Sequence, residues 1–286
     1  MTSYVESSEL RLPLGQVVET RLRRSALRAQ KLREVAGILG VARTAKLGLV
    51  RIAHGKEYPI TVSHADLDHP LHITSALADV CNAKEVLTGG AYALPPSMHD
   101  KLNGKPIVDV GAFIGISAAY LASQYKQSKV TAIEPLARNY DLLQRNAEEY
   151  GGQIQPVQAA LLADAGPAKI VGHHIRHPYM PLFASSDIPT QRGEESSLTT
   201  FSPQGLLDSL DNIDEIGILK IDIEGAEGEI FAASAMGAVL ARTSVLLIET
   251  HDQFVAGSSL VVARAAQEAQ MQASPVNDHT MAYSRL

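Results

Sequence analysis

The sequence predicts an α/β fold, a doubly wound and mostly parallel sheet covered by helices, with an N-terminal helical extension. Strand-like apolar runs and helix-like stretches alternate along the chain after this extension. One apolar run ends at Asp109 and Val110 and is followed by a glycine turn. The next apolar run is followed by the acid Glu134. This arrangement is typical of Rossmann-like folds that bind a nucleotide-type cofactor.

The elements follow in order along the chain. The run 107–110 has the character of a buried parallel strand, and Gly151-Gly152 marks the end of a helix. Ligands of such a sheet gather at the carboxyl ends of its strands. The predicted strands are 107–110, 130–133, 154–158, 217–222 and 245–250, and the predicted helices are 116–125, 138–150, 203–210, 226–233 and 258–273.

Two parts are predicted from length and charge: a basic helical extension, residues 1–60, and one large domain, residues 61–286. Residues 1–57 contain 11 Lys or Arg against 5 Asp or Glu, whereas the remainder contains 14 against 26. Residues 14–39 suit an amphipathic helix with a basic face. A solvated face is one interpretation, and docking on an anionic partner or membrane surface is another. We expect a homodimer in which this segment of one subunit packs on the acidic body of the second subunit.

Composition excludes several classes of protein. The single cysteine, Cys81, excludes an intrachain disulfide and a cysteine-built metal site. No apolar run is long enough to predict a transmembrane segment, and the first residues lack the pattern of a secretion signal, so we expect a cytoplasmic protein. Aromatic residues are 5% of the chain and do not alternate with basic ones, so no nucleic-acid partner is expected.

The glycine turn narrows the choice of cofactor. A dinucleotide fingerprint requires G-x-G-x-x-G, but this chain has Gly-Ala-Phe-Ile-Gly at 111–115, with bulky residues where a pyrophosphate would rest. S-adenosylmethionine has a ribose and an adenine but no phosphate, and it tolerates a turn with fewer glycines. Asp109 is placed to orient its ammonium group, and Glu134 is placed to accept hydrogen bonds from its ribose.

Several motifs together resemble the FkbM-type methyltransferases, which depend on S-adenosylmethionine. They are VDVGAFIG at 108–115, AIEPLARNYDLLQRNA at 132–147, AAL at 159–161, LKIDIEGAE at 219–227 and IETH at 248–251. The resemblance runs from about His69 to about Asp252, and the segment 66–92 looks like the short strand and helix that precede the cofactor fold in that family. The family usually has a polar residue, often Asn, where this chain has Phe113.

The resemblance implies a class I methyltransferase fold and methyl transfer to hydroxyl groups of sugars, glycolipids or natural products. We therefore expect an O-methyltransferase with a small-molecule or glycan acceptor, which would contact an insertion at about 169–201. The expected cofactor-binding residues lie in the glycine turn, at the second strand tip and beside the adenine: Asp109, Gly111, Ala112, Phe113, Gly115, Glu134, Pro135, Asn139, Ala160 and Leu161.

Catalysis is expected at the ends of two later strands. A hydroxyl is a poor nucleophile, so a base should assist, and His251 is preferred because its unperturbed pKa lies near neutrality. Asp222 would orient the base or the acceptor, Glu224 would orient the following turn or bind the acceptor, and Lys220 would steady a carboxylate or the developing alkoxide. No metal is required. If a divalent metal were present, Asp222, Glu224 and His251 would hold it.

Two other functions remain open at this stage. One is a non-catalytic binding or assembly subunit that kept the fold but lost turnover, which fold analogy alone cannot separate from an enzyme. The other is an NAD-dependent oxidoreductase, against which Phe113 and the missing third glycine argue.

Overall fold

A seven-stranded sheet with the order β12-β13-β11-β10-β3-β4-β5 forms the centre of the protein. The computed structural model describes residues 57–286, apart from 167, 175–176, 186–198 and 211–213. The predicted extension, residues 1–60, therefore lies outside the described residues except for its last four positions.

Five strands of this sheet are parallel. They are β3 (Ile107–Val110), β4 (Val130–Ile133), β5 (Ile154–Val157), β10 (Ile216–Ile221) and β11 (Thr243–Glu249). At one edge, β13 (Thr280–Ser284) runs antiparallel to both β11 and β12 (Gln272–Pro275). The prediction of a doubly wound, mostly parallel sheet is confirmed.

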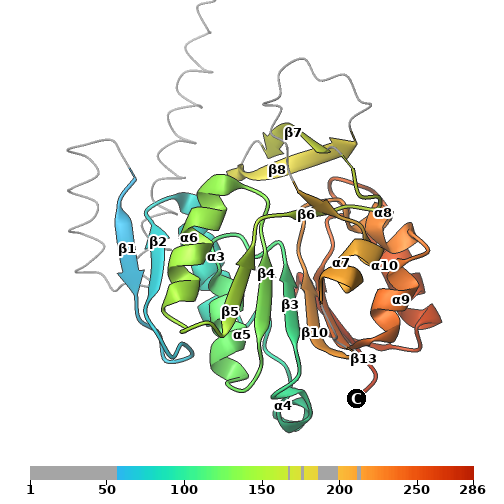
Figure 1. Cartoon of the computed structure of the whole chain (residues 1–286), viewed down its shortest axis with the longest axis horizontal. Helices are drawn as coiled ribbons and strands as arrows, with labels where there is room; N and C mark the ends of the chain where they lie inside the picture. The colour runs from blue at the N-terminus through green and yellow to red at the C-terminus, as the bar shows by residue number, and fades with distance from the viewer. Residues whose placement is uncertain (1–56, 167, 175–176, 186–198, 211–213) are drawn as a thin grey trace, which may run out of the picture. The chain divides into compact units, whose positions relative to one another are not determined.

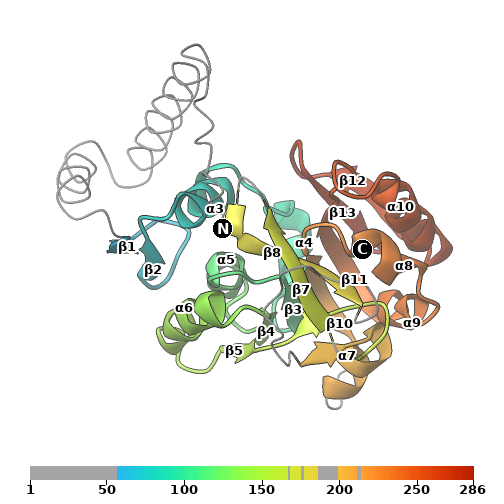
Figure 2. The ribbon, with the colours of Figure 1, turned by 90° about the horizontal axis from the view of Figure 1, so that it is seen from above.

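Helices cover both faces of the sheet, as the view along the strands shows (Figure 2). One group contains α3 (Leu77–Thr88), α5 (Ile116–Gln124) and α6 (Ala137–Glu148). The other contains α7 (Pro203–Ser209), α8 (Glu227–Ala232), α9 (Met236–Ala241) and α10 (Ser258–Glu268). A further short helix, α4 (Pro96–Leu102), leads into β3 (Figure 1).

The helix predicted over 258–273 is too long, because α10 ends at Glu268. Gln270 has a left-handed backbone with φ of 58°, which stops the helix, and the amide of Met271 donates to the carbonyl of Ala266. The residues that follow form β12, whose partner β13 is near the end of the chain. Local periodicity does not reveal this pairing.

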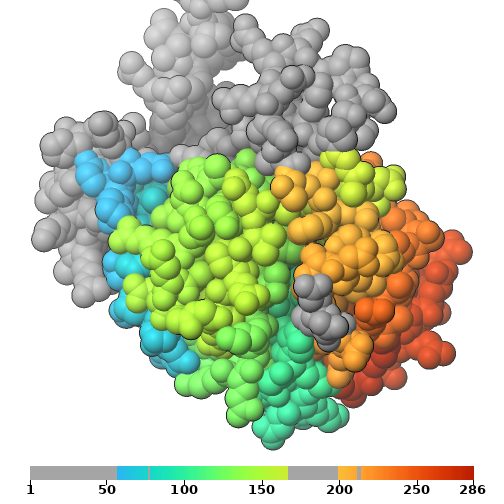
Figure 3. All heavy atoms as spheres, in the orientation of Figure 1, coloured from blue at the N-terminus to red at the C-terminus, as the bar shows by residue number. Residues whose placement is uncertain are grey.

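Outside the central sheet, the described residues form three small strand pairs. They are β1 (Pro59–Val62) with β2 (Leu71–Thr74), β6 (Ala160–Leu161) with β9 (Thr200–Phe201), and β7 (Ala168–His174) with β8 (His177–Ser185). The pairing of β6 with β9 brings the yellow-green and orange parts of the chain together on one face (Figure 3).

The β7–β8 pair and β9 fall within the insertion predicted at about 169–201. Figures 1 and 2 place this pair over the end of the sheet at which β3 and β4 finish. The β7–β8 pair therefore lies at the edge where ligands of such sheets bind. Among the described helices, none combines the length and the apolar character needed to cross a membrane.

Candidate active site

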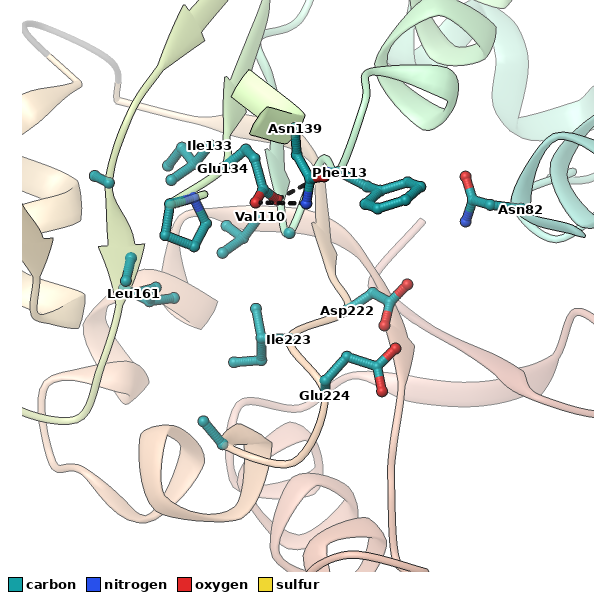
Figure 4. A pocket seen from close by; sticks show the side chains of 15 residues that line it. Asn82, Val110, Phe113, Ile133, Glu134, Asn139, Leu161, Asp222, Ile223 and Glu224 are labelled. Atoms are coloured by element: carbon teal, nitrogen blue, oxygen red, sulfur yellow. Dashed lines mark hydrogen bonds between the residues drawn. The ribbon is translucent and has the colours of Figure 1, made fainter. Parts of the chain in front are cut away.

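A cleft opens at the carboxyl ends of β3, β4 and β10. Its polar side chains come from the ends of β4 and β10 and from helices α3 and α6 (Figure 4). The lining residues are Asn82, Val110, Gly111, Phe113, Ile133, Glu134, Pro135, Asn139, Ala159, Ala160, Leu161, Asp222, Ile223, Glu224 and Ala226.

The turn after β3 forms one wall of this cleft and depends on glycine. Gly111 has φ of 75°, and a Cβ at this position would lie 1.8 Å from the backbone oxygen of Asp222. Only glycine allows the turns after β3 and β10 to approach so closely. Gly115, with φ of 86°, precedes α5, and a Cβ there would lie 2.8 Å from a methyl group of Leu143.

Phe113 also adopts a left-handed conformation, with φ of 52°. Among residues other than glycine, this region favours Asn and Asp and is unusual for a bulky aromatic side chain. This preference gives a physical reason why the resembled family favours Asn at the position. Phe113 lines the cleft, and its amide donates to Glu134.

Glu134, at the tip of β4, is held by three donors. Its Oε2 accepts from the amide of Phe113 at 3.1 Å, while Oε1 accepts from the amide of Leu136 at 2.9 Å and from Nδ2 of Asn139 at 3.1 Å. Burial raises the pKa of Glu134 to about 7, although these hydrogen bonds act in the opposite direction. A carboxylate has about four lone-pair sites, so it can accept a further hydrogen bond from a hydroxyl in the cleft.

The other expected cofactor residues divide into two groups. Pro135, Ala160 and Leu161 line the cleft together with Glu134 and Asn139. Asp109, Ala112 and Gly115 do not line it. The amide of Ala112 instead donates to the carbonyl of Ile133 at 2.9 Å, and this bond ties the glycine turn to β4.

Asp109 and Lys220 form a buried ion pair beneath the cleft. Asp109 Oδ2 accepts from the hydroxyl of Ser117 at 2.6 Å, and Oδ1 lies 3.0 Å from Lys220 Nζ. Lys220 Nζ also donates to the carbonyl of Gly111 at 2.7 Å and lies 4.0 Å from Asp222 Oδ2. Burial lowers the pKa of Lys220, but the charges of Asp109 and Asp222 outweigh it and raise the pKa overall. Both side chains support the turn from below, and Asp109 is fully buried and does not line the cleft.

His251 lies at the centre of a cluster of carboxylates. The ring is 4% exposed, and Nδ1 lies 2.8 Å from Oε1 of Glu227. On the other side of the ring, Nε2 is 3.8 Å from Asp222 Oδ1, 3.6 Å from Glu224 Oε2 and 3.7 Å from Glu249 Oε1. Of these residues only Asp222 and Glu224 line the cleft, and His251 stands behind them.

These charges change the proton affinity of the ring. Burial is the largest influence and lowers the pKa of His251, but the hydrogen bond to Glu227 and the charges of Asp222 and Glu224 raise it to about 9. Burial and the charge of Asp222 raise the pKa of Glu224 to about 7 and that of Glu249 to about 8. The preference for His251 as the base starts from its unperturbed pKa, whereas a ring among carboxylates holds its proton more tightly.

The sequence analysis missed three residues of this site. Glu227, fully buried, accepts hydrogen bonds from the amides of Ile223 and Gly225 and from His251. Its position in the EGAE motif, in the first turn of a helix, was a usable signal. Asn82 reaches the cleft from α3, and Tyr92 OH lies 3.5 Å from Asp222 Oδ2. No local pattern marked Asn82 or Tyr92.

Comparisons with known proteins identify the family of the chain. Residues 109–268, more than half of the chain, match the Methyltransferase FkbM domain. Methyltransferase sdnD of Sordaria araneosa is 27% identical over 176 residues, which cover 51% of this chain and 65% of that protein. Methyltransferase 1 of Beauveria bassiana is 24% identical over 169 residues, which cover 51% of this chain and 64% of that protein.

The matched region thus spans less than two thirds of either curated relative. Among solved structures, an O-methyltransferase family protein from Burkholderia thailandensis has a TM-score of 0.42 and 10% identity, and the match covers 73% of this chain and 57% of that one. This distant likeness carries no argument about function. The domain match, which includes the glycine turn and both strand-end acids, shows that the chain belongs to the FkbM family of S-adenosylmethionine-dependent methyltransferases.

Proposed function

We propose that this protein is an O-methyltransferase that transfers the methyl group of S-adenosylmethionine to a hydroxyl of a sugar, glycan or natural product. One observation carries this proposal: the strand-end acid Glu134 and the carboxylates Asp222 and Glu224 line the same cleft. A cofactor-binding acid and two proton acceptors therefore lie within reach of one bound pair of ligands (Figure 4).

The lining of the cleft fits the adenosyl part of the cofactor. Glu134 has spare acceptor capacity for ribose hydroxyls, and Asn139 fixes the orientation of the carboxylate. Ala160 and Leu161 supply an apolar slot for a flat ring, and Gly111 presents bare backbone. When bound, S-adenosylmethionine supplies an activated methyl group, which the acceptor oxygen receives as the carbon–sulfur bond breaks and the electron pair stays on sulfur.

The residues of the chain then have two tasks. They must align the acceptor oxygen with the methyl group, and much of the acceleration can come from this positioning. They must also take the hydroxyl proton, and we assign this task to Asp222 and Glu224, because they face the cleft and His251 does not. His251 and Lys220 act as positioning residues for these carboxylates.

Calorimetric titration tests the proposal. We expect purified protein to bind S-adenosylmethionine and S-adenosylhomocysteine with micromolar affinity, and Glu134→Ala to weaken both by more than about tenfold, since a charged hydrogen bond contributes about 1.5–3 kcal/mol. The matched control is Glu148→Ala, an exposed carboxylate on α6 that should leave binding unchanged.

Binding of NAD in place of the adenosyl ligands would indicate an oxidoreductase and contradict the proposal. Once adenosyl binding is established, a screen of hydroxylated acceptors with labelled methyl donor tests O-methylation itself. Label transferred only to nitrogen or carbon acceptors would overturn the assignment to oxygen.

A further inference from the structure

Asp222, Glu224 and His251 come together from two neighbouring strand ends and offer three ligand atoms within 4.8 Å of one another. Asp222 and Glu224 follow β10, and His251 follows β11, the parallel strand beside it. From this geometry we infer that the three residues form a binding site for a hard divalent cation, Mg²⁺ or Mn²⁺. The binding of the cation is independent of the proposed function, whereas its use in holding an acceptor rests on that function.

The distances suit one coordination sphere. Mg²⁺ binds oxygen at about 2.0–2.1 Å in an octahedron, so adjacent ligand atoms lie about 3.0 Å apart and opposite ones about 4.2 Å apart. His251 Nε2 is 3.8 Å from Asp222 Oδ1 and 3.6 Å from Glu224 Oε2, between these two limits. Small side-chain rotations would place all three atoms around one ion.

The histidine is oriented as a ligand. Its Nδ1 donates to the buried carboxylate of Glu227, which directs Nε2 toward Asp222 and Glu224. A bound cation would displace the proton that Nε2 holds in its absence. Although the side chain is 5% exposed, Nε2 forms no hydrogen bond within the described part of the chain. A histidine fixed by a carboxylate on its second nitrogen is a common arrangement around protein-bound metals.

One of the oxygen ligands also lacks a hydrogen-bond partner in the part of the protein that the structure describes. Asp222 Oδ1 is buried and has no hydrogen-bond partner among the described residues. Lys220 is 4.0 Å from Asp222 but only 3.0 Å from Asp109, so it chiefly neutralises the latter. Buried polar atoms without partners are costly, and a cation would satisfy this one.

Glu224 is held in a strained conformation, with φ of 58°. Left-handed backbone at a residue other than glycine is energetically costly and clusters at functional sites. The neighbouring Gly225 has φ of 113°, and the amide of Gly225 bonds to Glu227. This turn directs the Glu224 carboxylate into the cleft beside Asp222 (Figure 4).

Two carboxylates and one imidazole favour Mg²⁺ or Mn²⁺ over softer metals, which prefer sulfur or several histidines. Three protein ligands leave about three positions of an octahedron for water or for an acceptor. Since Asp222 and Glu224 line the cleft, those positions face it. An acceptor with two adjacent oxygen atoms, such as a vicinal diol, is the class of substrate that this site would select.

Titration with Mn²⁺ alone tests the site, because bound Mn²⁺ loses the electron paramagnetic resonance signal of the free hydrated ion. We expect the full-length protein, without cofactor or acceptor, to bind one Mn²⁺ with micromolar affinity and Mg²⁺ to displace it. Glu224→Gln and His251→Gln should each weaken binding by more than about tenfold. Glu229→Gln, an exposed carboxylate on α8, is the matched control and should bind like the wild type.

Circular dichroism verifies that each variant folds, and Glu224 is the safer substitution because its side chain is 17% exposed. Weak binding that is equal in the wild type and in both site variants would overturn the inference. Calorimetry with S-adenosylmethionine on the same samples separates the two proposals. Cofactor binding without Mn²⁺ binding refutes only the cation site, and Mn²⁺ binding without cofactor binding refutes only the proposed function.

Discussion

At the scale of single residues, Glu134 combines burial with hydrogen bonding. Its carboxylate is 5% exposed, and burial raises the pKa to about 7, above the ordinary value of 4.5. The folded chain therefore binds this proton more tightly than the unfolded chain between these two values. The resulting stabilisation is fully present below pH 4.5 and is lost as the pH rises through 7.

We predict that Glu134→Gln reduces this dependence of stability on pH. The wild type without ligand should lose on the order of 3 kcal/mol of its free energy of unfolding between about pH 4.5 and pH 7 through this group. The variant, which cannot titrate here, should have a flatter profile even if its stability is lower throughout. Urea denaturation across this pH range measures the free energy of unfolding of both proteins. Identical slopes of this free energy against pH would contradict the prediction.

At the scale of elements, Asn146 on α6 connects the β1–β2 pair to the glycine turn. This side chain is 1% exposed, and its Oδ1 accepts from the amide of His72 at 2.7 Å. Its Nδ2 donates to the carbonyls of His72 and Ile114 at 2.9 and 2.7 Å. One amide thus fixes a strand pair and the turn that borders the cleft.

Replacing this amide should remove the hydrogen bonds between these elements and lower the stability of the protein. We predict that Asn146→Leu destabilises the protein by about 2–4 kcal/mol, because it leaves one N–H and two carbonyls without their partner. Gln144→Leu, on the exposed side of the same helix, is the control and should change stability by less than about 0.5 kcal/mol. Equal unfolding midpoints for the two variants in urea would show that Asn146 does not connect these elements.

At the scale of the whole molecule, charge is divided between a basic N-terminal part and an acidic remainder. The N-terminal part lies outside the described residues, so the homodimer expected through it stays a prediction. Its basis is the amphipathic pattern of residues 14–39 and the opposite charge of the body.

Charge reversal in the full chain tests this prediction. We expect the wild type to be a dimer, and replacement of Arg21, Arg24, Arg28 and Lys31 by Glu to yield a monomer, because attraction to the acidic body becomes repulsion. A variant with Arg and Lys exchanged at the same positions keeps the charge and should remain dimeric. Light scattering coupled to size-exclusion chromatography measures the mass. A single mass for all three proteins would contradict the prediction.

Local patterns in the sequence were sufficient to predict much of the fold and several of the residues that line the cleft. Strands β3 and β4 have the predicted bounds, because an apolar run between turn residues is a local signal. Gly111, Glu134 and Asn139 line the cleft, since the strand–turn–helix order alone sets their positions. By contrast, β12 and β13 depend on contacts between distant segments, and no local pattern indicated them.

The sequence by itself therefore determined the α/β alternation, the glycine turn and the acids at the strand ends. Tertiary structure alone decided which charges meet. Asp109 and Lys220 pair because the parallel register of β3 and β10 sets them side by side, which removes both from the cleft. Burial lowers the pKa of His251, but folding raises it overall because carboxylates from α8 and from the turn after β10 lie beside the ring. Proton affinity and ion pairing depend on distances in space, and the spacing of residues along a chain does not specify those distances.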